Sequence, residues 1–322
     1  MFKAITDVSG IRVGQVSDRE ALTGCTVIIS PQGAVAGVDV RGSAPGTRET
    51  DALDPLNLVE KIHAVVLTGG SAFGLDAAGG VMEYLEGKGI GYDVGVTRVP
   101  IVAAAVLFDL GIGNPRVRPD GAMGYQAAAA AGEGPVEEGN VGAGTGATVG
   151  KLLNPQGSMK SGLGTTSLRV GDLIVGALVA VNAWGDVVDP ATGKILAGAL
   201  GPGNTFIDTE KYLRENPYTP PRNPGNTTIG VVATNARLEK TGAAKVAQQA
   251  QDGYARAIRP VHTMLDGDTT FCLATGQVTA DLNQVGSLAA QAMAEAILRA
   301  VRQARGAGGL PAAVELAGRE KP

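Results

Sequence analysis

The chain has 322 residues, enough for one large domain or two ordinary ones and for a sizeable buried core. Its formal charge of −4, with Lys and Arg scattered along the sequence, argues against binding to nucleic acid or an anionic membrane. No stretch reaches the ~20 apolar residues of a membrane span, and the N-terminus lacks a signal-peptide pattern, so we expect a cytoplasmic protein.

The core has to be built from small and aliphatic residues, because only 4% of the residues are aromatic while 48 are glycine. Cys25 and Cys272 lie in apolar, strand-like runs. This setting favours buried small hydrophobic residues over a disulfide or a redox pair.

The first forty residues predict short strands at 11–13, 25–29 and 34–40. A dense polar loop follows at 41–51. It is either a surface turn or a loop that supports a site or a subunit contact.

An apolar strand at 63–68 leads through a glycine-rich turn at 69–74 into a helix that ends near Leu85. The turn does not fit the G-x-S-x-G nucleophile elbow, because its second glycine comes one residue late. Close packing of strand against helix is favoured over anion binding. Residues 99–110 predict a buried element, and residues 122–132 predict an Ala-rich helix.

The glycine-rich segment 142–151 nearly matches a dinucleotide fingerprint, but no apolar strand precedes it. It also misses the P-loop, in which Ser or Thr would stand at Leu152. We therefore expect no nucleotide and no other cofactor. A loop that brings its backbone and Lys151 close to a reacting centre is favoured.

Residues 165–189 predict a hairpin whose apolar strand, 173–181, ends in Asn182. An Asn in this position is either a satisfied cap or turn residue or a side-chain donor for an oxyanion.

A proline-rich segment at 201–226 has no periodic order and ends abruptly at a β-branched strand, 227–234. The junction between Asn226 and Thr227 is either an ordinary loop-to-strand boundary or a place where the chain cuts itself. In the second case Thr227 becomes an N-terminus, and its α-amine, with a reference pKa of about 8, can take the hydroxyl proton and activate Oγ as a nucleophile.

Helices are predicted around 243–258 and 285–297, with a strand after 268 and a loose tail at 306–322. Strands and helices mix without a second hydrophobic core. The sequence therefore predicts a single α+β domain over residues 1–322.

Asp266 and Asp268 flank one glycine, so an extended turn would point both carboxylates the same way. The pair is either a solvated acidic turn or a device that orients Thr227. The spacing of a calcium-binding EF-hand is absent, and we expect no metal. His262, just before the turn, is interpreted as structural rather than as a base.

These segments together resemble the DmpA-type peptidase family (family S58), through residues 7–14, 41–51, 67–76, 142–151 and 229–236. The family includes L-aminopeptidase/D-amidase-esterases, β-peptidyl aminopeptidases and nylon-oligomer hydrolases. The Asn226–Thr227 pair and the Asp-Gly-Asp turn look most like the nylon-oligomer hydrolase branch. The substrate is the property that the resemblance predicts least well, because the family acts on peptides, amino amides, β-peptides and aminohexanoate oligomers.

The resemblance implies an αββα sandwich like that of N-terminal-nucleophile hydrolases, self-cleaved into chains 1–226 and 227–322. It implies that Asp266 and Asp268 orient Thr227, and that Asn182 and Lys151 line the oxyanion and amine side. Lys160 is the alternative to Lys151, and Thr228 the alternative to Thr227. It also implies a small peptide or amide substrate and a homo-oligomer such as a tetramer.

Two differences from the family stand out: residues 99–109 contain no Tyr where some members have one, and Gln15 replaces a common His. Two other functions are considered. One is an acyltransferase related to ornithine acetyltransferases, against which the N-terminal motifs argue. The other is a non-enzymatic small-molecule-binding or scaffold protein that stays uncut.

Overall fold

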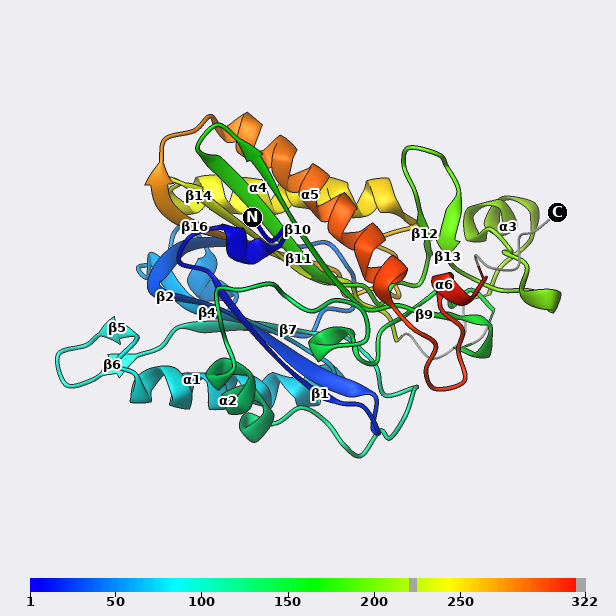
Figure 1. Cartoon of the computed structure of the whole chain (residues 1–322), viewed down its shortest axis with the longest axis horizontal. Coiled ribbons are helices and arrows are strands. Elements are labelled where there is room, and N and C mark those ends of the chain that lie inside the picture. The colour runs from blue at the N-terminus through cyan, green and yellow to red at the C-terminus, as the bar shows by residue number, and fades with distance from the viewer. Residues whose placement is uncertain (154, 220–224, 317–322) are drawn as a thin grey trace.

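The computed structural model describes residues 1–153, 155–219 and 225–316, and in these residues one mixed sheet of nine strands runs through the molecule (Figure 1). Eight of its strands follow the order β10-β11-β14-β16-β2-β4-β7-β3, and β1 also pairs with β2. The strands are β1 (Arg12–Asp18), β2 (Thr23–Val40), β3 (Thr47–Arg48), β4 (Lys61–Thr68), β7 (Val102–Val106), β10 (Leu163–Val170), β11 (Leu173–Ala180), β14 (Ile229–Ala236) and β16 (Thr269–Val278).

The long strand β2 joins the two halves of the sheet. Its C-terminal part pairs with β16, and its N-terminal part pairs with β1 and β4. The sequence predicts two separate strands here, and that prediction is wrong. The chain stays extended through an irregularity between Ile29 and Ala34, where Pro31 has no N–H to give to the ladder and Gly33 has φ +71°.

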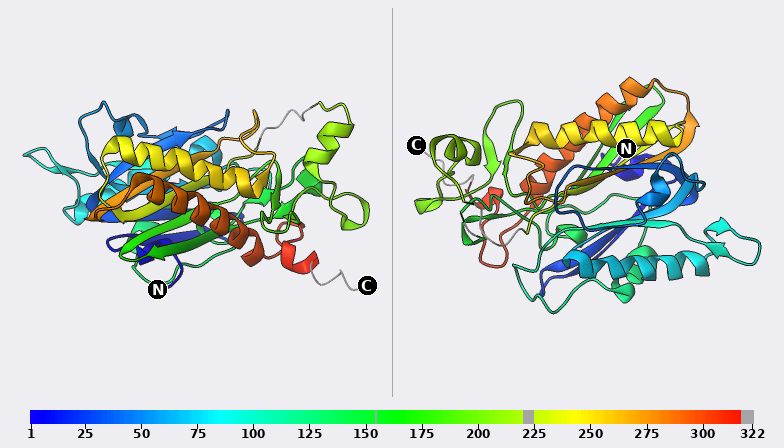
Figure 2. Two further views of the ribbon diagram at one scale, coloured as in Figure 1. Left: turned by 90° about the horizontal axis from the view of Figure 1, so that it is seen from above. Right: turned by 180° about the vertical axis from the view of Figure 1, so that it is seen from behind.

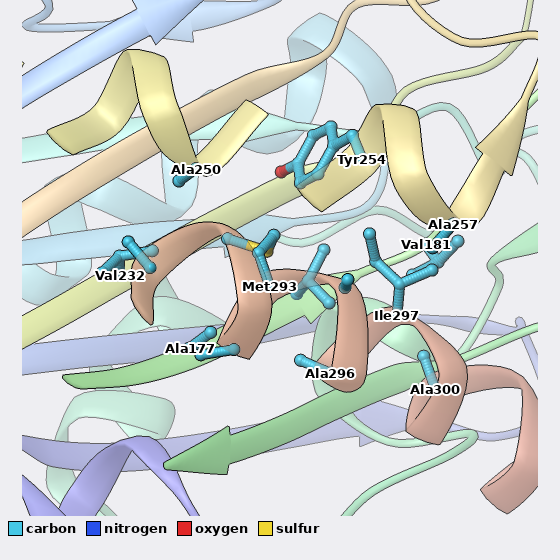
Figure 3. Packing of buried hydrophobic residues seen from close by; sticks show 14 of the residues in the cluster. Ala177, Val181, Val232, Ala250, Tyr254, Ala257, Met293, Ala296, Ile297 and Ala300 are labelled. Carbon is cyan, nitrogen blue, oxygen red and sulfur yellow. The ribbon is translucent and has the colours of Figure 1, made fainter. Parts of the chain in front are cut away.

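Two long helices, α4 (Lys240–Ala257) and α5 (Leu282–Gln303), cover one half of the sheet (Figure 1). Their small residues let them pack closely: a Cβ built on Gly253 would lie 2.5 Å from the carbonyl oxygen of Ala290. Figure 3 shows Tyr254 of α4, Met293 of α5 and the sheet residue Val232 in one hydrophobic cluster. This is the helix stripe that the sequence predicts.

Two shorter helices, α1 (Ala77–Gly87) and α2 (Gly121–Ala129), cover the other half, formed by β1, β2, β4 and β7 (Figure 2). A Cβ built on Gly80 of α1 would lie 1.7 Å from the carbonyl oxygen of Gly121, so the two helices also touch through glycine. Asp120 is the N-cap of α2, and its side chain accepts from the N–H of Met123 at 2.9 Å.

A third hydrophobic cluster lies between the two halves of the sheet and includes Ile28, Leu67, Val231 and Phe271. With the helix layers on the outside, the order of layers is helix, sheet, sheet, helix. The expected αββα arrangement is confirmed. This central cluster takes residues from both sides of the junction between Asn226 and Thr227.

Smaller elements lie at both ends of the molecule (Figure 1). At one end are β5 (Tyr92–Asp93) and β6 (Arg98–Val99), and at the other are β9 (Met159–Lys160), β12 (Asp186–Val188), β13 (Ile195–Ala197), α3 (Thr209–Glu215) and α6 (Ala313–Leu316). Two more short strands are β8 (Thr148–Val149) and β15 (Ile258–Arg259). Among all helices of the described residues, none combines the length and the apolar character needed to cross a membrane. Cys25 and Cys272 are buried and free, as predicted.

Two predicted irregular stretches are partly ordered. The segment 201–226 contains helix α3, whose N-cap is Asp208. The Asp208 side chain accepts from the N–H of Lys211 at 3.1 Å. Residues 220–224 of that segment lie outside the described residues. The tail from 306 to 316 is not loose, because Glu315 accepts from the N–H of Gly306 at 2.7 Å and the carbonyl of Pro311 accepts from that of Lys160 at 2.8 Å. Residues 317–322 lie outside the described residues.

Candidate active site

The predicted cleavage junction lies at the end of three neighbouring strands, in the half of the sheet that α4 and α5 cover. Strands β14 and β16 are parallel, with Ile229 opposite Thr269, so the residues that precede both strands lie side by side. A further bridge pairs Asn226 with Asp266. Strand β11 runs antiparallel to β14, and its last residue, Ala180, faces Ile229. Segments distant in sequence thus meet at the start of β14.

The peptide bond between Asn226 and Thr227 is buried and held on both sides. The N–H of Thr227 donates to the main-chain oxygen of Asn182 at 2.8 Å. The carbonyl oxygen of Asn226 accepts from the N–H of Gly267 at 3.2 Å and makes a very short contact with Thr227 Oγ1. The hydroxyl therefore lies against the carbonyl group of the residue before it, and an N–H polarises that carbonyl.

Gly267 fits at this place because it has no side chain. A Cβ built on it would lie 2.7 Å from Thr227 Oγ1 and 2.4 Å from the carbonyl oxygen of Ala44. The sequence analysis did not single out Gly267 as a donor, because a backbone N–H leaves no trace in residue type. Its position between two aspartates was the available signal.

The polar loop at 41–51 hydrogen-bonds to the turn at 266–268, which carries the two aspartates and is called the acidic turn below. The N–H of Ala44 donates to the carbonyl oxygen of Asp266 at 2.9 Å, and the N–H of Arg41 donates to that of Asp268 at 3.0 Å. The loop is largely exposed, as a surface turn would be, and it also hydrogen-bonds to the turn at 266–268.

Thr227 and its neighbour Thr228 differ in what their polar groups contact. The main-chain N–H of Thr228 donates to Asp268 Oδ1 at 2.7 Å, but its hydroxyl, in the described residues, has no hydrogen-bond partner. Side chains alternate along the strand: Val231 belongs to the cluster between the sheet halves, whereas Val232 packs under α4 and α5. The same alternation places Thr227 on the face of the sheet toward the central cluster and Thr228 on the face toward α4 and α5.

The carboxylate of Asp266 does not hydrogen-bond to Thr227. Its Oδ1 accepts from the N–H of Trp184 at 3.1 Å, and its Oδ2 accepts from the N–H of Thr263 at 3.2 Å and from the Thr263 hydroxyl. Burial, and then the neighbouring carboxylate of Asp268, raise the pKa of Asp266 to about 6.

The carboxylate of Asp268 holds Thr228 and His262. Its Oδ1 accepts from the N–H of Thr228, and its Oδ2 lies 2.8 Å from His262 Nδ1 and accepts from the His262 N–H at 3.2 Å. The two aspartates thus use their oxygens on different partners rather than pointing together at Thr227. His262, interpreted as structural from the sequence, is part of this cluster.

Lys151 and Asn182 form the opposite wall. Lys151 Nζ donates to Asn182 Oδ1 at 2.9 Å and to the carbonyl oxygens of Thr148 and Asn182 at 3.0 and 3.3 Å. Burial lowers the pKa of Lys151 to about 7, although the Asp266 carboxylate opposes the shift. Because Asn182 Oδ1 also accepts from the N–H of Thr148 at 3.0 Å, the Asn182 amide presents its Nδ2 to the carbonyls of Phe108 at 2.9 Å and Gly225 at 3.4 Å.

Lys160, the alternative to Lys151, lies in a different place. Its Nζ donates to the carbonyl oxygens of Ala147 at 2.5 Å and Ser161 at 3.1 Å, and it interacts with the buried carboxylate of Asp109. Burial lowers its pKa to about 7 as well. The structure brings Lys151, and not Lys160, onto Asn182.

A cavity of about 570 Å³ opens beside the junction, within the size range of ordinary small-molecule sites. Gly225 and Asn226 form part of its wall, and Lys151 and Thr148 connect it to the cluster just described. The remaining wall residues are Phe108, Asp109, Leu110, Gly111, Ile112, Gly113, Gly146, Leu153, Gln156, Ser158, Trp184, Leu265, Gly308 and Leu310. Throughout the residues that the structure describes, no group of three or more His, Cys, Asp or Glu is placed to hold a metal ion.

Comparison with known proteins identifies the family. The model of peptidase family S58 matches residues 3–313. An uncharacterized aminopeptidase from Mycobacterium tuberculosis (strain ATCC 25618 / H37Rv) is 44% identical, over 96% of this chain and 96% of its own length. A 6-aminohexanoate-oligomer endohydrolase from Kocuria sp. (strain KY2) is 30% identical, over 92% of this chain and 85% of its own.

The fold agrees with a solved structure, that of an L-aminopeptidase D-Ala-esterase/amidase from Ochrobactrum anthropi, which its description places among the variants of the N-terminal-nucleophile hydrolase fold. The TM-score is 0.74 at 20% identity, over 99% of this chain and 95% of that one. The family and fold expected from the sequence are confirmed. The sequence analysis placed the chain nearest to the nylon-oligomer hydrolase branch of the family. The sequence identities do not agree with this, because the identity to the mycobacterial aminopeptidase is 44% and that to the 6-aminohexanoate-oligomer endohydrolase is 30%.

Proposed function

Since the chain belongs to peptidase family S58, we propose that it is a self-processing amidohydrolase whose nucleophile is Thr227, freed by cleavage of its own bond to Asn226. The products are residues 1–226 and residues 227–322. One observation carries this proposal: Thr227 Oγ1 lies against the Asn226 carbonyl, whose oxygen accepts from the Gly267 N–H at 3.2 Å.

Self-cleavage begins when Thr227 Oγ1 attacks the carbonyl carbon of Asn226. The negative charge that develops on the carbonyl oxygen is stabilised by the N–H of Gly267. The C–N bond then breaks, the hydroxyl proton ends on the nitrogen of Thr227, and an ester joins Asn226 to Oγ1. Water hydrolyses the ester and leaves a carboxylate on Asn226 and a free amine and hydroxyl on Thr227.

Turnover repeats the same chemistry on a substrate. The free amine of Thr227 accepts the Oγ1 proton, Oγ1 attacks the amide carbon, and the leaving amine takes the proton. Water then hydrolyses the ester. The carbonyl of Asn182, which accepts from the Thr227 N–H at 2.8 Å, orients the new amine, and Lys151 keeps Asn182 in place.

The two aspartates act through their neighbours. Asp268 fixes the strand next to the nucleophile through the N–H of Thr228, and Asp266 fixes the turn that follows Asn182 through the N–H of Trp184. Both are positioning residues in this proposal. The substrate is a peptide, an amino amide or an oligoamide, in keeping with the relatives named for aminopeptidase and 6-aminohexanoate-oligomer endohydrolase activity.

The test is the intact mass of the purified protein under denaturing conditions, beside that of its Thr227→Ala variant. We expect fragments of 226 and 96 residues from the parent and a single chain from the variant. A parent chain that stays whole after prolonged incubation would rule out the mechanism and leave the binding-protein interpretation.

A further inference from the structure

His262, which lies just before the acidic turn, contacts the carboxylate of Asp268 twice. Its ring nitrogen Nδ1 lies 2.8 Å from Asp268 Oδ2, and its main-chain N–H donates to the same oxygen at 3.2 Å. Because an ionised carboxylate accepts hydrogen bonds and does not donate them, Nδ1 carries the proton in this contact. The side chain of Asp268 is 1% exposed and that of His262 is 17% exposed, so the contact is largely shielded from solvent and strengthened by that shielding.

The backbone of His262 has a conformation that is uncommon for a residue with a side chain. Its φ is +55°, in the left-handed region that favours glycine. Such a conformation costs free energy and persists only where the surrounding structure holds it in place. Here the main-chain N–H and the ring of His262 both contact Asp268, and the ring centroid lies 5.9 Å from that of Tyr254 on α4. The fold therefore holds the histidine on the carboxylate from several directions.

Asp268 connects His262 to the residue that follows the proposed nucleophile. Its other oxygen, Oδ1, accepts from the N–H of Thr228 at 2.7 Å, and the carbonyl oxygen of Thr228 accepts from the N–H of Thr269 at 3.1 Å. The peptide group between Thr227 and Thr228 is thus held by the Asp268 side chain, and His262 fixes the direction of that side chain.

The proposed cleavage changes how much the position of Thr227 depends on these contacts. In the uncut chain Thr227 is also held through its bond to Asn226, whose carbonyl oxygen accepts from the N–H of Gly267 at 3.2 Å. Once that bond is broken, the Gly267 contact holds the other chain only. Thr227 is then a chain end, and chain ends are poorly ordered unless they are tied down. The carbonyl of Asn182 on one side and the Asp268 side chain on the other are the contacts that remain to fix it.

We propose that His262 is a positioning residue for turnover: by holding Asp268, it keeps the free N-terminal Thr227 in the place from which Oγ1 attacks a substrate. This inference rests on the proposed function and adds a residue to it. A displacement of about 1 Å at a reacting group can cost about 10²-fold in rate, so loss of the His262 contact slows turnover. Self-cleavage depends on the contact much less, because the uncut chain restrains Thr227 from both sides.

The experiment compares His262→Gly with His262→Asn. Both replacements tolerate a positive φ, but only Asn places an N–H donor, its Nδ2, where the histidine has Nδ1. His262→Gln keeps more of the volume and carries its amide where the histidine has Nε2, so it serves as a second variant without the donor at Nδ1. Denaturing gels give the time course of self-cleavage for each protein.

The probe for turnover is p-nitrophenyl acetate, an activated ester that reports on the reactivity of the hydroxyl whatever the natural substrate is. Release of p-nitrophenolate is measured per cleaved chain, above the background of the uncut Thr227→Ala variant. We expect His262→Gly and His262→Gln to react at least about 10-fold more slowly than the parent, and His262→Asn to react at about the parent's rate. All three should self-cleave at nearly the parent's rate.

Three results overturn the inference: parent-like reaction in the Gly and Gln variants, no recovery in His262→Asn, or a loss of self-cleavage as large as the loss of turnover. The last two are what a merely structural role of the histidine would give. Failure of the proposed function looks different and takes this inference with it: the parent itself stays uncut, or releases p-nitrophenolate no faster than Thr227→Ala.

Discussion

The ammonium of Lys151 donates to Asn182 twice, to its side-chain Oδ1 at 2.9 Å and to its main-chain oxygen at 3.3 Å. That main-chain oxygen is also the acceptor for the N–H of Thr227, at 2.8 Å. One lysine thus fixes both the amide orientation of Asn182 and the carbonyl on which the proposed new amine rests.

Replacing Lys151 with Met should slow self-cleavage by about 10²-fold, within the range seen when one preorganised polar contact is removed from a reacting centre. Methionine keeps an unbranched, flexible side chain without the ammonium, so the three hydrogen bonds to Thr148 and Asn182 are lost. The measurement is the time course of chain cleavage on denaturing gels after expression. Lys245→Met, at an exposed lysine on α4, should cleave like the parent, and equal rates in both variants would remove Lys151 from the mechanism.

The two adjacent threonines should differ completely. Thr227→Val keeps the shape of the side chain and removes the hydroxyl, so we expect an uncut chain. Thr228→Val should cut at the normal rate and lose little stability, because the Thr228 hydroxyl is buried without a hydrogen-bond partner in the described residues. Mass spectrometry of both proteins decides the matter. If the Thr227→Val protein is cut, the nucleophile must be assigned to Thr228 instead.

Adding a methyl group at Gly267 should impair both folding and cleavage. The new Cβ would lie 2.4 Å from the carbonyl oxygen of Ala44 and 2.7 Å from Thr227 Oγ1, so we expect a loss of ~1–3 kcal/mol in the free energy of unfolding and slower cleavage. Gly79→Ala is the matched control: its Cβ meets nothing within 4 Å, and helix α1 should gain ~0.5–1 kcal/mol. Urea unfolding measures the free energy of unfolding of both variants, and denaturing gels measure their cleavage. Unchanged cleavage in Gly267→Ala would contradict the close approach.

The buried Lys160 should make stability depend on pH. Its pKa falls from 10.5 to about 7 in the folded protein because of burial, so between these values the unfolded chain holds more protons than the folded one. Stability from this group therefore rises with pH across that window, by at most ~1.4 kcal/mol per pH unit. Lys160→Met should be less stable at pH 8.5 relative to the parent than it is at pH 7. Parallel values of the unfolding free energy at the two pH values would show that Lys160 stays charged.

Much of the fold could be predicted from the sequence because its long elements have strong periodic patterns. The apolar runs at 63–68, 173–181 and 227–234 correspond to β4, β11 and β14, and the stripe that starts at Ala243 corresponds to α4. The boundaries of elements, and the short elements themselves, were harder to predict. Helix α3 and the tail from 306 to 316 are stabilised by contacts with distant residues, such as Pro311 with Lys160, which no local pattern records.

The residues of the candidate site could be predicted better than their contacts. Residue types pointed to Thr227, Asn182, Lys151 and the two aspartates, and the structure places all of them around one junction. The direction of each side chain could not be predicted, because it depends on strand pairing: Asp268 holds Thr228 and His262, and Asp266 holds Trp184 and Thr263. The Gly267 donor comes from backbone geometry alone.

The order of strands has a consequence for the fate of the cut protein. β14 and β16, which follow the junction, lie between β11 and β2, which precede it, so the two proposed product chains would alternate within one sheet. The proposed cleavage would therefore yield fragments that are interleaved rather than docked side by side. They can separate only when the central ladders on both sides of the β14–β16 pair break. A nicked molecule should thus migrate in native separation as one particle of unchanged size, and loss of either chain should coincide with global unfolding.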